Sequence, residues 1–164
     1  MAGEQRRFTF FWQSESPFSQ WHPSEFVVKG KRFACAEQYM MYGKAELFGD
    51  MAVAQRILAS KSPRTQKALG RKVNGFDEGL WRRERERIVY EGNHAKFTQN
   101  EELLKALLAT AGTELVEASP TDRIWGVGLS EEDPRILNPA QWRGENLLGK
   151  VLTRLREELL ARGG

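Results

Sequence analysis

Residues that form disulfides or bind metals are scarce in this sequence. One cysteine and two histidines occur in 164 residues, which excludes an internal disulfide framework and argues against a structural zinc site. His22 and His94 are far apart in the chain, and Cys35 is expected to be a packed thiol at the start of a helix. No Gly-x-Gly-x-x-Gly motif follows a strand, and a Walker-type lysine loop is missing. We therefore expect no metal and no cofactor.

Long apolar stretches are also missing. No hydrophobic run approaches the roughly 20 residues that a helix needs to span a bilayer. The N-terminus lacks the apolar core of a secretory signal, and the single cysteine fits a reducing compartment. We expect a cytoplasmic protein, or a nuclear one if its source is eukaryotic, with no membrane partner.

The composition is that of a globular domain. Hydrophobic residues make up 40% of the chain and charged residues 29%, and the length suffices for one domain with a substantial core. A formal charge of +3 and a pI near 9.1 permit attraction to phosphate without requiring it. Five tryptophans carry more information, because several lie in turn-rich or charged contexts instead of apolar runs.

The hydrophobic patterns predict a mainly α (α+β) fold. We expect a flexible N-terminus at residues 1–7, followed by a single compact multihelical domain over residues 8–162 with a small N-terminal β-hairpin or sheet. β-prone residues predict a strand at 8–12, a hairpin around Gly30 and a short strand at 114–118. Helices are expected at 36–48, 51–59, 63–72, 77–98, 101–111 and 145–162. Asp50 is expected to cap the second of these helices and Ser62 the third.

Three segments allow more than one interpretation. The stretch Arg82–Arg87 holds four arginines and two glutamates, which is typical of a solvated face laced with salt bridges but is also compatible with a phosphate-binding patch. A loop of about 25 residues from Ser119 to Arg143 is long for a compact domain, where such loops are more often functional than idle. Phe18 and Trp21 lie in a polar loop, where they either pin the loop to the core or line a pocket.

The helix expected at 36–48 carries an acid and an amine on the edge of its apolar face. Glu37 and Lys44 are two turns apart, so their Cα atoms should be separated by roughly 10 Å. Because helical side chains lean toward the N-terminus, the long Lys44 side chain points back toward Glu37. On an arbitrary helix such a pair would be two solvent-exposed charged side chains without a function. If it is a site, the carboxylate can stabilise an oxocarbenium-like centre and the lysine can attack a sugar carbon to form an imine.

The start of the last helix is a second candidate. Asn146 and Gly149 lie there, and a helix N-terminus presents free backbone N–H groups with a partial positive charge. We therefore expect this end of the helix to be able to hold a phosphate. Together with the polar loop and the Glu37–Lys44 pair, it would suit a phosphorylated sugar.

Nine short motifs follow one another in a specific order. They are Ser16-Pro17-Phe18-Ser19, a hairpin ending at Gly30, Ala36-Glu37-Gln38-Tyr39 with Lys44-Ala45, Trp81 ahead of a basic helix, Ala95-Lys96-Phe97, Leu103 with Leu107-Leu108, Leu115-Val116-Glu117, Asp122-x-x-Trp125-Gly126-x-Gly128 and Asn146-x-x-Gly149. In this order they resemble the NADAR family, which includes the bacterial YbiA proteins. The resemblance runs from about Phe8 to Leu160.

Two departures from the family pattern lie beside the expected site. Where many YbiA-like members have Glu-His-Tyr, this chain has Glu37-Gln38-Tyr39. Where they have Phe-Ser-Asn-Phe, it has Phe18-Ser19-Gln20-Trp21. Neither departure changes Glu37 or Lys44, so we expect them to bear on substrate preference.

The resemblance implies a YbiA-like domain at residues 8–162 with N-glycosidase activity on a ribosyl C–N bond, without a metal. It implies that Glu37 is a catalytic carboxylate and that Lys44 is the amine at the anomeric carbon, with a ring-opened imine as one route. For Trp81, a core anchor is the alternative to a stacking surface. Substrate contacts are implied for Phe18, Ser19, Trp21, Tyr39, Trp81, Asp122, Trp125, Gly126, Asn146 and Gly149.

Three functions stay open within this resemblance. The first is removal of ADP-ribose from modified guanine bases in nucleic acid, and the second is hydrolysis of ribosylamino-pyrimidine phosphate intermediates of riboflavin synthesis. The third is a module that binds ADP-ribose without cleaving it, against which the presence of both Glu37 and Lys44 argues. We expect a monomer whose partner is a small ADP-ribose-containing or ribosyl-phosphate substrate, with ADP-ribosylated DNA or RNA as a further candidate.

Overall fold

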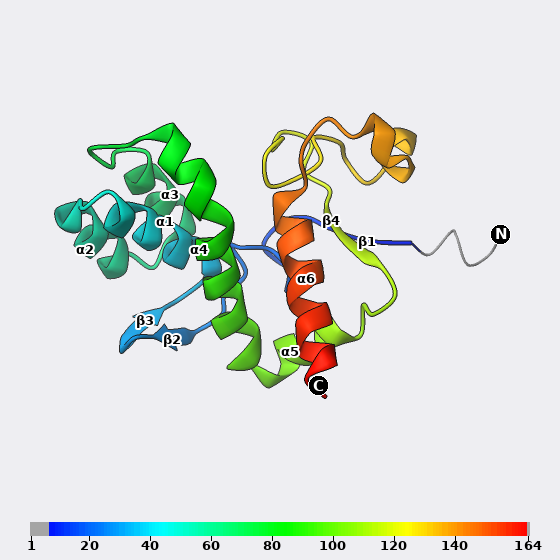
Figure 1. Ribbon diagram of the computed structural model, residues 1–164, viewed down its shortest axis with the longest axis horizontal. Coiled ribbons are helices and arrows are strands. Elements are labelled where there is room, and N and C mark those ends of the chain that lie inside the picture. The colour runs from blue at the N-terminus through cyan, green and yellow to red at the C-terminus, as the bar shows by residue number, and fades with distance from the viewer. Residues whose placement is uncertain (1–6, 164) are drawn as a thin grey trace. The chain divides into compact units, whose positions relative to one another are not determined.

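The computed structural model describes residues 7–163, and Figure 1 shows the order of their helices and strands. Contacts divide the chain into two compact units. The central unit is Gln20–Glu101, and the terminal unit takes the chain up to Ser19 and again from Glu102. Residues 1–6 of the terminus expected to be flexible lie outside the described part. Within residues 7–163, no helix combines the length and the apolar character that crossing a membrane requires.

Helix α1 (Ala36–Leu47) is the element around which the central unit packs. It contacts the three other helices of the unit, which are α2 (Met51–Ala59), α3 (Pro63–Gly70) and α4 (Glu78–Thr98). Asp50, Ser62 and Asp77 start these three helices, because each side chain accepts a hydrogen bond from the backbone N–H three residues later. The capping roles expected for Asp50 and Ser62 are thereby confirmed.

The close contact between α1 and α4 depends on glycine. A Cβ at Gly43 would lie 2.7 Å from a methyl carbon of Ile88, and a Cβ at Gly92 would lie 2.7 Å from the ring of Tyr39. Both distances are shorter than carbon atoms tolerate, so the two helices approach each other where one of them has no side chain. This contact fixes the orientation of α1 and therefore of the side chains on its other face.

A hairpin completes the central unit. Strands β2 (Phe26–Val28) and β3 (Lys31–Phe33) pair antiparallel with Phe26 opposite Phe33. The rings of these two residues stack at 5.6 Å, and Tyr39 of α1 meets the Phe33 ring edge-on at 5.0 Å. The predicted hairpin is therefore confirmed, and aromatic contacts attach it to α1.

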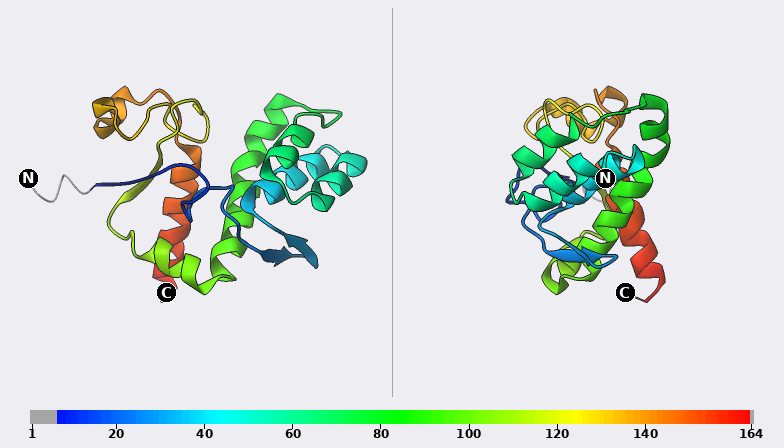
Figure 2. Two further views of the ribbon diagram at one scale, coloured as in Figure 1. Left: turned by 180° about the vertical axis from the view of Figure 1, so that it is seen from behind. Right: turned by 90° about the vertical axis from the view of Figure 1, so that its left-hand side faces the viewer.

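The terminal unit contains a two-stranded parallel sheet that the sequence did not indicate. Strand β1 (Phe8–Phe11) pairs with β4 (Glu114–Glu117), and α6 (Leu147–Ala161) packs on β4. Figure 2 shows β1 and β4 from two further sides. Helix α5 (Glu101–Leu108) leads into this unit and ends three residues before the expected limit. Within the described residues, six α-helices and four short strands confirm the mainly α (α+β) fold.

The long loop is more ordered than expected. It contains two 3₁₀ turns, η2 (Pro134–Leu137) and η3 (Pro139–Gln141). Trp142 packs against its core and donates a hydrogen bond from its indole to the carbonyl of Ile136 at 2.8 Å. The buried residues of this core are Val116, Ala118, Val127, Leu129 and Ile136. The loop therefore has an apolar core of its own, built on strand β4.

Candidate functional site

Glu37 is a buried carboxylate in the first turn of α1. Only 4% of the residue is exposed, and its backbone N–H donates to the carbonyl of Gln20 at 2.9 Å. The positive end of the helix dipole favours a negative charge at this position. A carboxylate buried at a helix N-terminus is held in one place and shielded from bulk water, as a catalytic group has to be.

Lys44 is half-buried two turns later on the same helix. Its ammonium lies 4.8 Å from the ring centre of Phe76 and 5.6 Å from that of Trp81. Burial lowers the pKa of Lys44, the neighbouring Arg71 lowers it further, and Glu37 raises it. Glu37 and Lys44 are thus close enough to interact electrostatically. The lowered pKa increases the neutral fraction of the amine, which is the nucleophilic form.

Two further residues beside Lys44 were not singled out from the sequence. Phe76 is 46% exposed, an unusual position for so large a ring. Its ring lies 5.3 Å from that of Phe48. Arg71 lies at the C-terminal end of α3. The available signal was a turn, Val73-Asn74-Gly75, followed by an aromatic residue that fits no apolar stripe.

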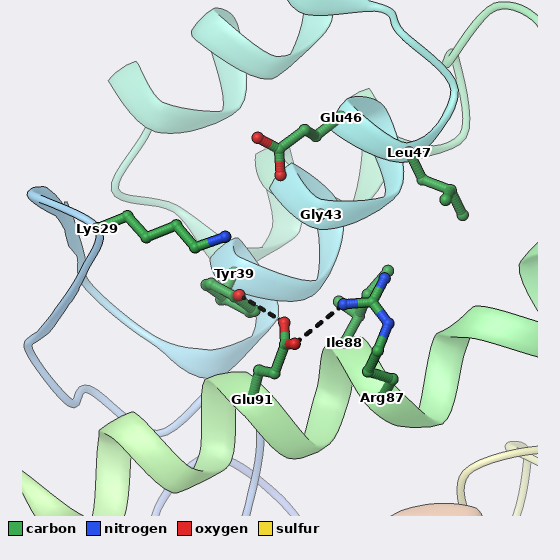
Figure 3. A pocket seen from close by; sticks show the side chains of 8 residues that line it. All are labelled: Lys29, Tyr39, Gly43, Glu46, Leu47, Arg87, Ile88 and Glu91. Carbon is green, nitrogen blue, oxygen red and sulfur yellow. Dashed lines mark hydrogen bonds and ion pairs between the residues drawn. The ribbon is translucent and has the colours of Figure 1, made fainter.

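Tyr39 lies on a different face of α1. It is two residues from Glu37, so the two side chains point about 200° apart around the helix. Its hydroxyl donates to Glu91 at 3.0 Å, and burial and that carboxylate raise the pKa of Tyr39. Tyr39 and Arg87 both line a cavity of about 110 Å³, and Figure 3 shows the two side chains in contact with Glu91. Tyr39 therefore belongs to a cavity whose lining includes neither Glu37 nor Lys44.

The loop before the hairpin divides between two roles. Phe18 is buried, and its ring meets that of Phe11 edge-on at 5.7 Å, which is the pinning role considered for it. Ser19 and Trp21 are half-buried. Trp81 is half-buried against Lys44, which suits a wall of the site better than a core anchor.

Asp122 and Gly126 shape the loop that follows β4. One carboxylate oxygen of Asp122 accepts hydrogen bonds from the backbone N–H groups of Ile124 and Trp125, both at 2.9 Å. A Cβ at Gly126 would lie 3.0 Å from the carbonyls of Asp122 and Glu117. Asp122 therefore organises the turn that carries the half-buried Trp125.

Asn146 and Gly149 connect α6 to β4. The fully buried side chain of Asn146 accepts from the N–H of Glu117 at 3.0 Å and donates to the carbonyl of Leu115 at 3.1 Å. A Cβ at Gly149 would lie 2.1 Å from that same carbonyl. The motif Asn146-x-x-Gly149 thus lets the helix approach the strand closely, and the amide is occupied by backbone partners.

Three of the N–H groups expected to be free at the start of the last helix are occupied by backbone carbonyls. The backbone N–H groups of residues 146, 147 and 148 donate to the carbonyls of residues 126, 124 and 125. The expectation of a phosphate site on these three groups is therefore wrong. The physical reason is that the preceding loop folds back and supplies the carbonyls itself.

Two residues that depart from the family pattern, Gln38 and Gln20, are packing residues. Gln38 is buried, accepts from the N–H of Ala34 at 2.7 Å and donates to the carbonyl of Ser60 at 2.7 Å. Gln20 and Asn93 exchange two amide hydrogen bonds at 3.0 and 3.1 Å. These amides join α1 and the preceding loop to their neighbours in the central unit.

The arginine-rich stretch of α4 is a salt-bridged face. Arg82 pairs with Glu78 at 3.1 Å, and Arg87 pairs with Glu84 at 2.8 Å and with Glu91 at 3.0 Å. These pairs confirm the first interpretation for Arg82 and Arg87. Among residues 7–163, no group of three or more His, Cys, Asp or Glu residues is arranged to hold a metal ion.

The central unit therefore brings together Glu37, Lys44 and Trp81, with Phe76 and Arg71 in addition. It separates Tyr39 from them. Phe18 and Ser19 belong to the terminal unit, as do all predicted contacts from Asp122 to Gly149. A meeting of those residues with Glu37 and Lys44 stays a prediction.

Comparisons with known proteins assign this arrangement to a family. A model described as the NADAR domain matches residues 10–160. N-glycosidase R617 of Acanthamoeba polyphaga mimivirus is 46% identical over 86% of this chain and 86% of its own. The chloroplastic riboflavin biosynthesis protein PYRR of maize is 36% identical to this chain in the aligned part. That part covers 66% of this chain but only 16% of the maize protein.

A solved structure agrees with the fold. The NMR structure of the Escherichia coli protein YbiA superposes with a TM-score of 0.79 at 28% identity, over 96% of this chain and 88% of that one. In sequence, N-glycosidase YbiA of this organism is 31% identical over 88% of this chain and 79% of its own length.

Proposed function

Since the chain belongs to the NADAR domain family, we propose that it removes ADP-ribose from modified guanine bases in nucleic acid. The broader activity is that of the family: the chain is a hydrolase acting on N-glycosyl bonds. Glu37 is the proposed catalytic carboxylate, and Lys44 is the proposed amine at the anomeric carbon. The observation that carries the proposal is the aromatic, half-buried setting of Lys44 beside the buried Glu37.

The proposed chemistry replaces a C–N bond with a C–O bond at the expense of one water. The neutral Lys44 amine attacks C1 of the ribose as the C1–N bond to the base breaks, and the base leaves with one proton from the attacking nitrogen. The second proton of that nitrogen passes to the ring oxygen as the C1–O bond of the ring breaks, which gives an open-chain imine. Water then hydrolyses the imine and restores the amine. Glu37 stabilises the positive charge that develops at C1 and then assists the attacking water.

The remaining predicted contacts complete the proposed site. Trp81 supplies a stacking surface next to Lys44, and Trp21 and Ser19 are proposed to approach from the loop before the hairpin. Asp122, Trp125 and Gly126 are proposed to hold the ribose and phosphates through the turn that Asp122 organises. For Asn146 and Gly149, we propose that they support this turn from beneath, because their contacts are to strand β4.

The choice of an ADP-ribosylated base rests on the family resemblance and on the net charge of +3, which favours a phosphate-rich substrate. The ion pairs of Arg82 and Arg87 remove these two arginines as an argument for nucleic acid.

The second candidate is hydrolysis of a ribosylamino-pyrimidine phosphate. Similarity to part of a plant riboflavin biosynthesis protein favours it. The same Glu37 and Lys44 would act on the same type of bond, so the two functions differ only in the base and in the number of phosphates. The third candidate is a module that binds ADP-ribose without turnover. In that case the wild-type protein releases no product, so replacing Glu37 or Lys44 changes no reaction rate.

A product assay separates the three candidates. The protein is offered ADP-ribosylated guanosine in a DNA oligonucleotide and, separately, a ribosylamino-pyrimidine phosphate. We expect the protein to release ADP-ribose from the oligonucleotide at least tenfold faster than it hydrolyses the ribosylamino-pyrimidine phosphate. Preference for the pyrimidine would establish the second candidate. Tight binding of ADP-ribose with no product from either substrate would establish the third.

A further inference from the structure

We propose that the connection between α3 and α4, residues 71–77, contacts the substrate: Arg71 binds a phosphate group, and Phe76 stacks on a planar base. This inference rests on the proposed function, because it assigns ligand groups to the surroundings of Lys44. Neither residue belongs to a motif of the family resemblance. Their placement next to the Lys44 amine is the reason to assign them.

Arg71 directly follows Gly70, where α3 packs so closely on α1 that a Cβ would clash with the sulfur of Met41. Met41 is three residues before Lys44, so this contact brings the start of the connection close to Lys44. Arg71 is exposed, it makes no ion pair within residues 7–163, and its charge lowers the pKa of Lys44. Glu37 raises the pKa of Lys44, but its effect is smaller than that of Arg71. A phosphate next to Arg71 would turn the repulsion into attraction. The planar guanidinium is the side chain best suited to it, because it donates two parallel hydrogen bonds.

Phe76 is a large ring left open to solvent. It is 46% exposed, and one neighbour of its ring is Phe48 at 5.3 Å. The Lys44 ammonium lies 4.8 Å from its centre. An exposed ring this close to the proposed reaction centre offers a surface on which a purine or pyrimidine can stack.

The connection is fixed in place by hydrogen bonds. Asp50, which caps α2, accepts from the backbone N–H of Asn74 at 2.9 Å and from its side-chain amide at 3.3 Å. Gly75 adopts a φ of +78°, a conformation that favours glycine. Val73 is buried. The backbone that leads to Phe76 is thus held in place, which lowers the entropy lost on binding.

A cation at the end of α3 also has a structural explanation, since it interacts well with the helix dipole. Arg56 provides the matched control, because it is an exposed arginine in the last turn of α2. Arg71→Met and Arg56→Met are compared on ADP-ribosylated guanosine and on ribosylguanine without phosphate. We expect Arg71→Met to raise KM about 10- to 100-fold on the first substrate only. We expect Arg56→Met to change neither KM.

Phe76 is tested in parallel by Phe76→Leu, which keeps an apolar side chain but removes the ring. We expect a KM increase of about tenfold. Met51→Ala, at an equally exposed apolar position, is expected to have no effect. Unchanged KM values for both Arg71→Met and Phe76→Leu, in an enzyme that turns over normally, would overturn the inference.

Failure of the proposed function is recognised separately. If the wild-type protein releases no base from any substrate, the dissociation constant of ADP-ribose is measured by calorimetry on the same variants. Weaker binding by Arg71→Met with Arg56→Met unchanged supports the inference although the enzyme assignment fails. Equal binding by all variants, or no binding by the wild type, overturns it.

Discussion

The environment of single side chains decides what this protein can do chemically. An ordinary lysine is almost fully protonated near neutral pH and is a poor nucleophile. Lys44 differs because its burial and the nearby Arg71 both lower its pKa. Glu37 acts in the opposite direction. The amine therefore stays attracted to the carboxylate without being locked into its charged form.

Catalysis through the neutral Lys44 amine predicts a specific pH profile. Because the reactive form is deprotonated, kcat/KM should rise with pH through the pKa of Lys44 and level off above it. Since that pKa is lowered, the plateau should begin below the value of an ordinary lysine, about 10.4. Arg71→Met should move the rise to higher pH, because a charge that lowers the pKa is lost. The measurement is kcat/KM against pH for both proteins.

Borohydride trapping supplies the control for this profile. An imine during turnover should give a sugar adduct on Lys44 that mass spectrometry locates, and Lys44→Met should give none. If kcat/KM falls across the same pH range and no adduct forms at Lys44, the amine is not the nucleophile. Lys44 would then act in its charged form.

Gln38 tests whether a departure from the family pattern concerns the substrate or the core. Gln38→His restores the residue common at this position. The imidazole cannot reproduce the hydrogen bonds of the amide to Ala34 and Ser60, so we expect a loss of about 1–3 kcal/mol in the free energy of unfolding. Chemical denaturation measures it. A changed ratio of kcat/KM between the two candidate substrates, at unchanged stability, would contradict this packing role.

At the scale of elements, α1 presents different functions on different faces. One edge carries Glu37 and Lys44, while the face with Gly43 and Tyr39 packs on α4 and the hairpin. Periodicity was enough to predict the helix and the Glu37–Lys44 edge. Tyr39 was implied by the family motif instead, and it points to another face than Glu37 because that motif runs through consecutive residues that point in different directions.

Elements defined by local signals were predicted well. The capping residues Asp50 and Ser62 and the turn at Gly30 act through neighbours in the sequence, so the sequence contains the information. Arg71 and Phe76 were missed for the opposite reason. Their importance comes from the position of Lys44 about 30 residues earlier, which only packing reveals.

Asn146 is predicted to matter mainly for the junction between α6 and β4. Asn146→Ala leaves the N–H of Glu117 and the carbonyl of Leu115 without their buried partner. It also places alanine at a φ of +54°. We expect a loss of about 3 kcal/mol or more in the free energy of unfolding, measured by denaturant titration. Asn138→Ala, at an exposed 3₁₀ cap, should cost about 1 kcal/mol or less. Equal stability of Asn146→Ala and the wild type would contradict the structural role.

At the scale of the whole molecule, pairings between distant segments escaped the sequence. Strand β1 pairs in parallel with β4 although about 100 residues separate them, and parallel pairing leaves no hairpin signal. The composition of two short strands does not show that they pair with each other. The resemblance to a family covered this gap for the fold class, because the order of motifs spans both units.

The nucleic acid part of the proposal predicts a dependence on salt. With a net charge of +3, contacts to a DNA backbone release counterions, so log kcat/KM on an ADP-ribosylated oligonucleotide should fall with log salt by about 0.7 per phosphate contacted on a single strand. On ADP-ribosylated guanosine as a free nucleoside the slope should be much shallower. Steady-state kinetics between low and high salt measures both. Identical slopes would indicate that the enzyme acts on the nucleoside and ignores the strand.

The pairing of Glu37 with Lys44 as one active site is tested most directly by Glu37→Gln. This change keeps the size of a buried side chain and removes its charge. We predict that release of ADP-ribose from ADP-ribosylated guanosine falls at least 1000-fold, while the dissociation constant of ADP-ribose changes by less than about threefold. Turnover at the wild-type rate by a folded Glu37→Gln protein would contradict the account.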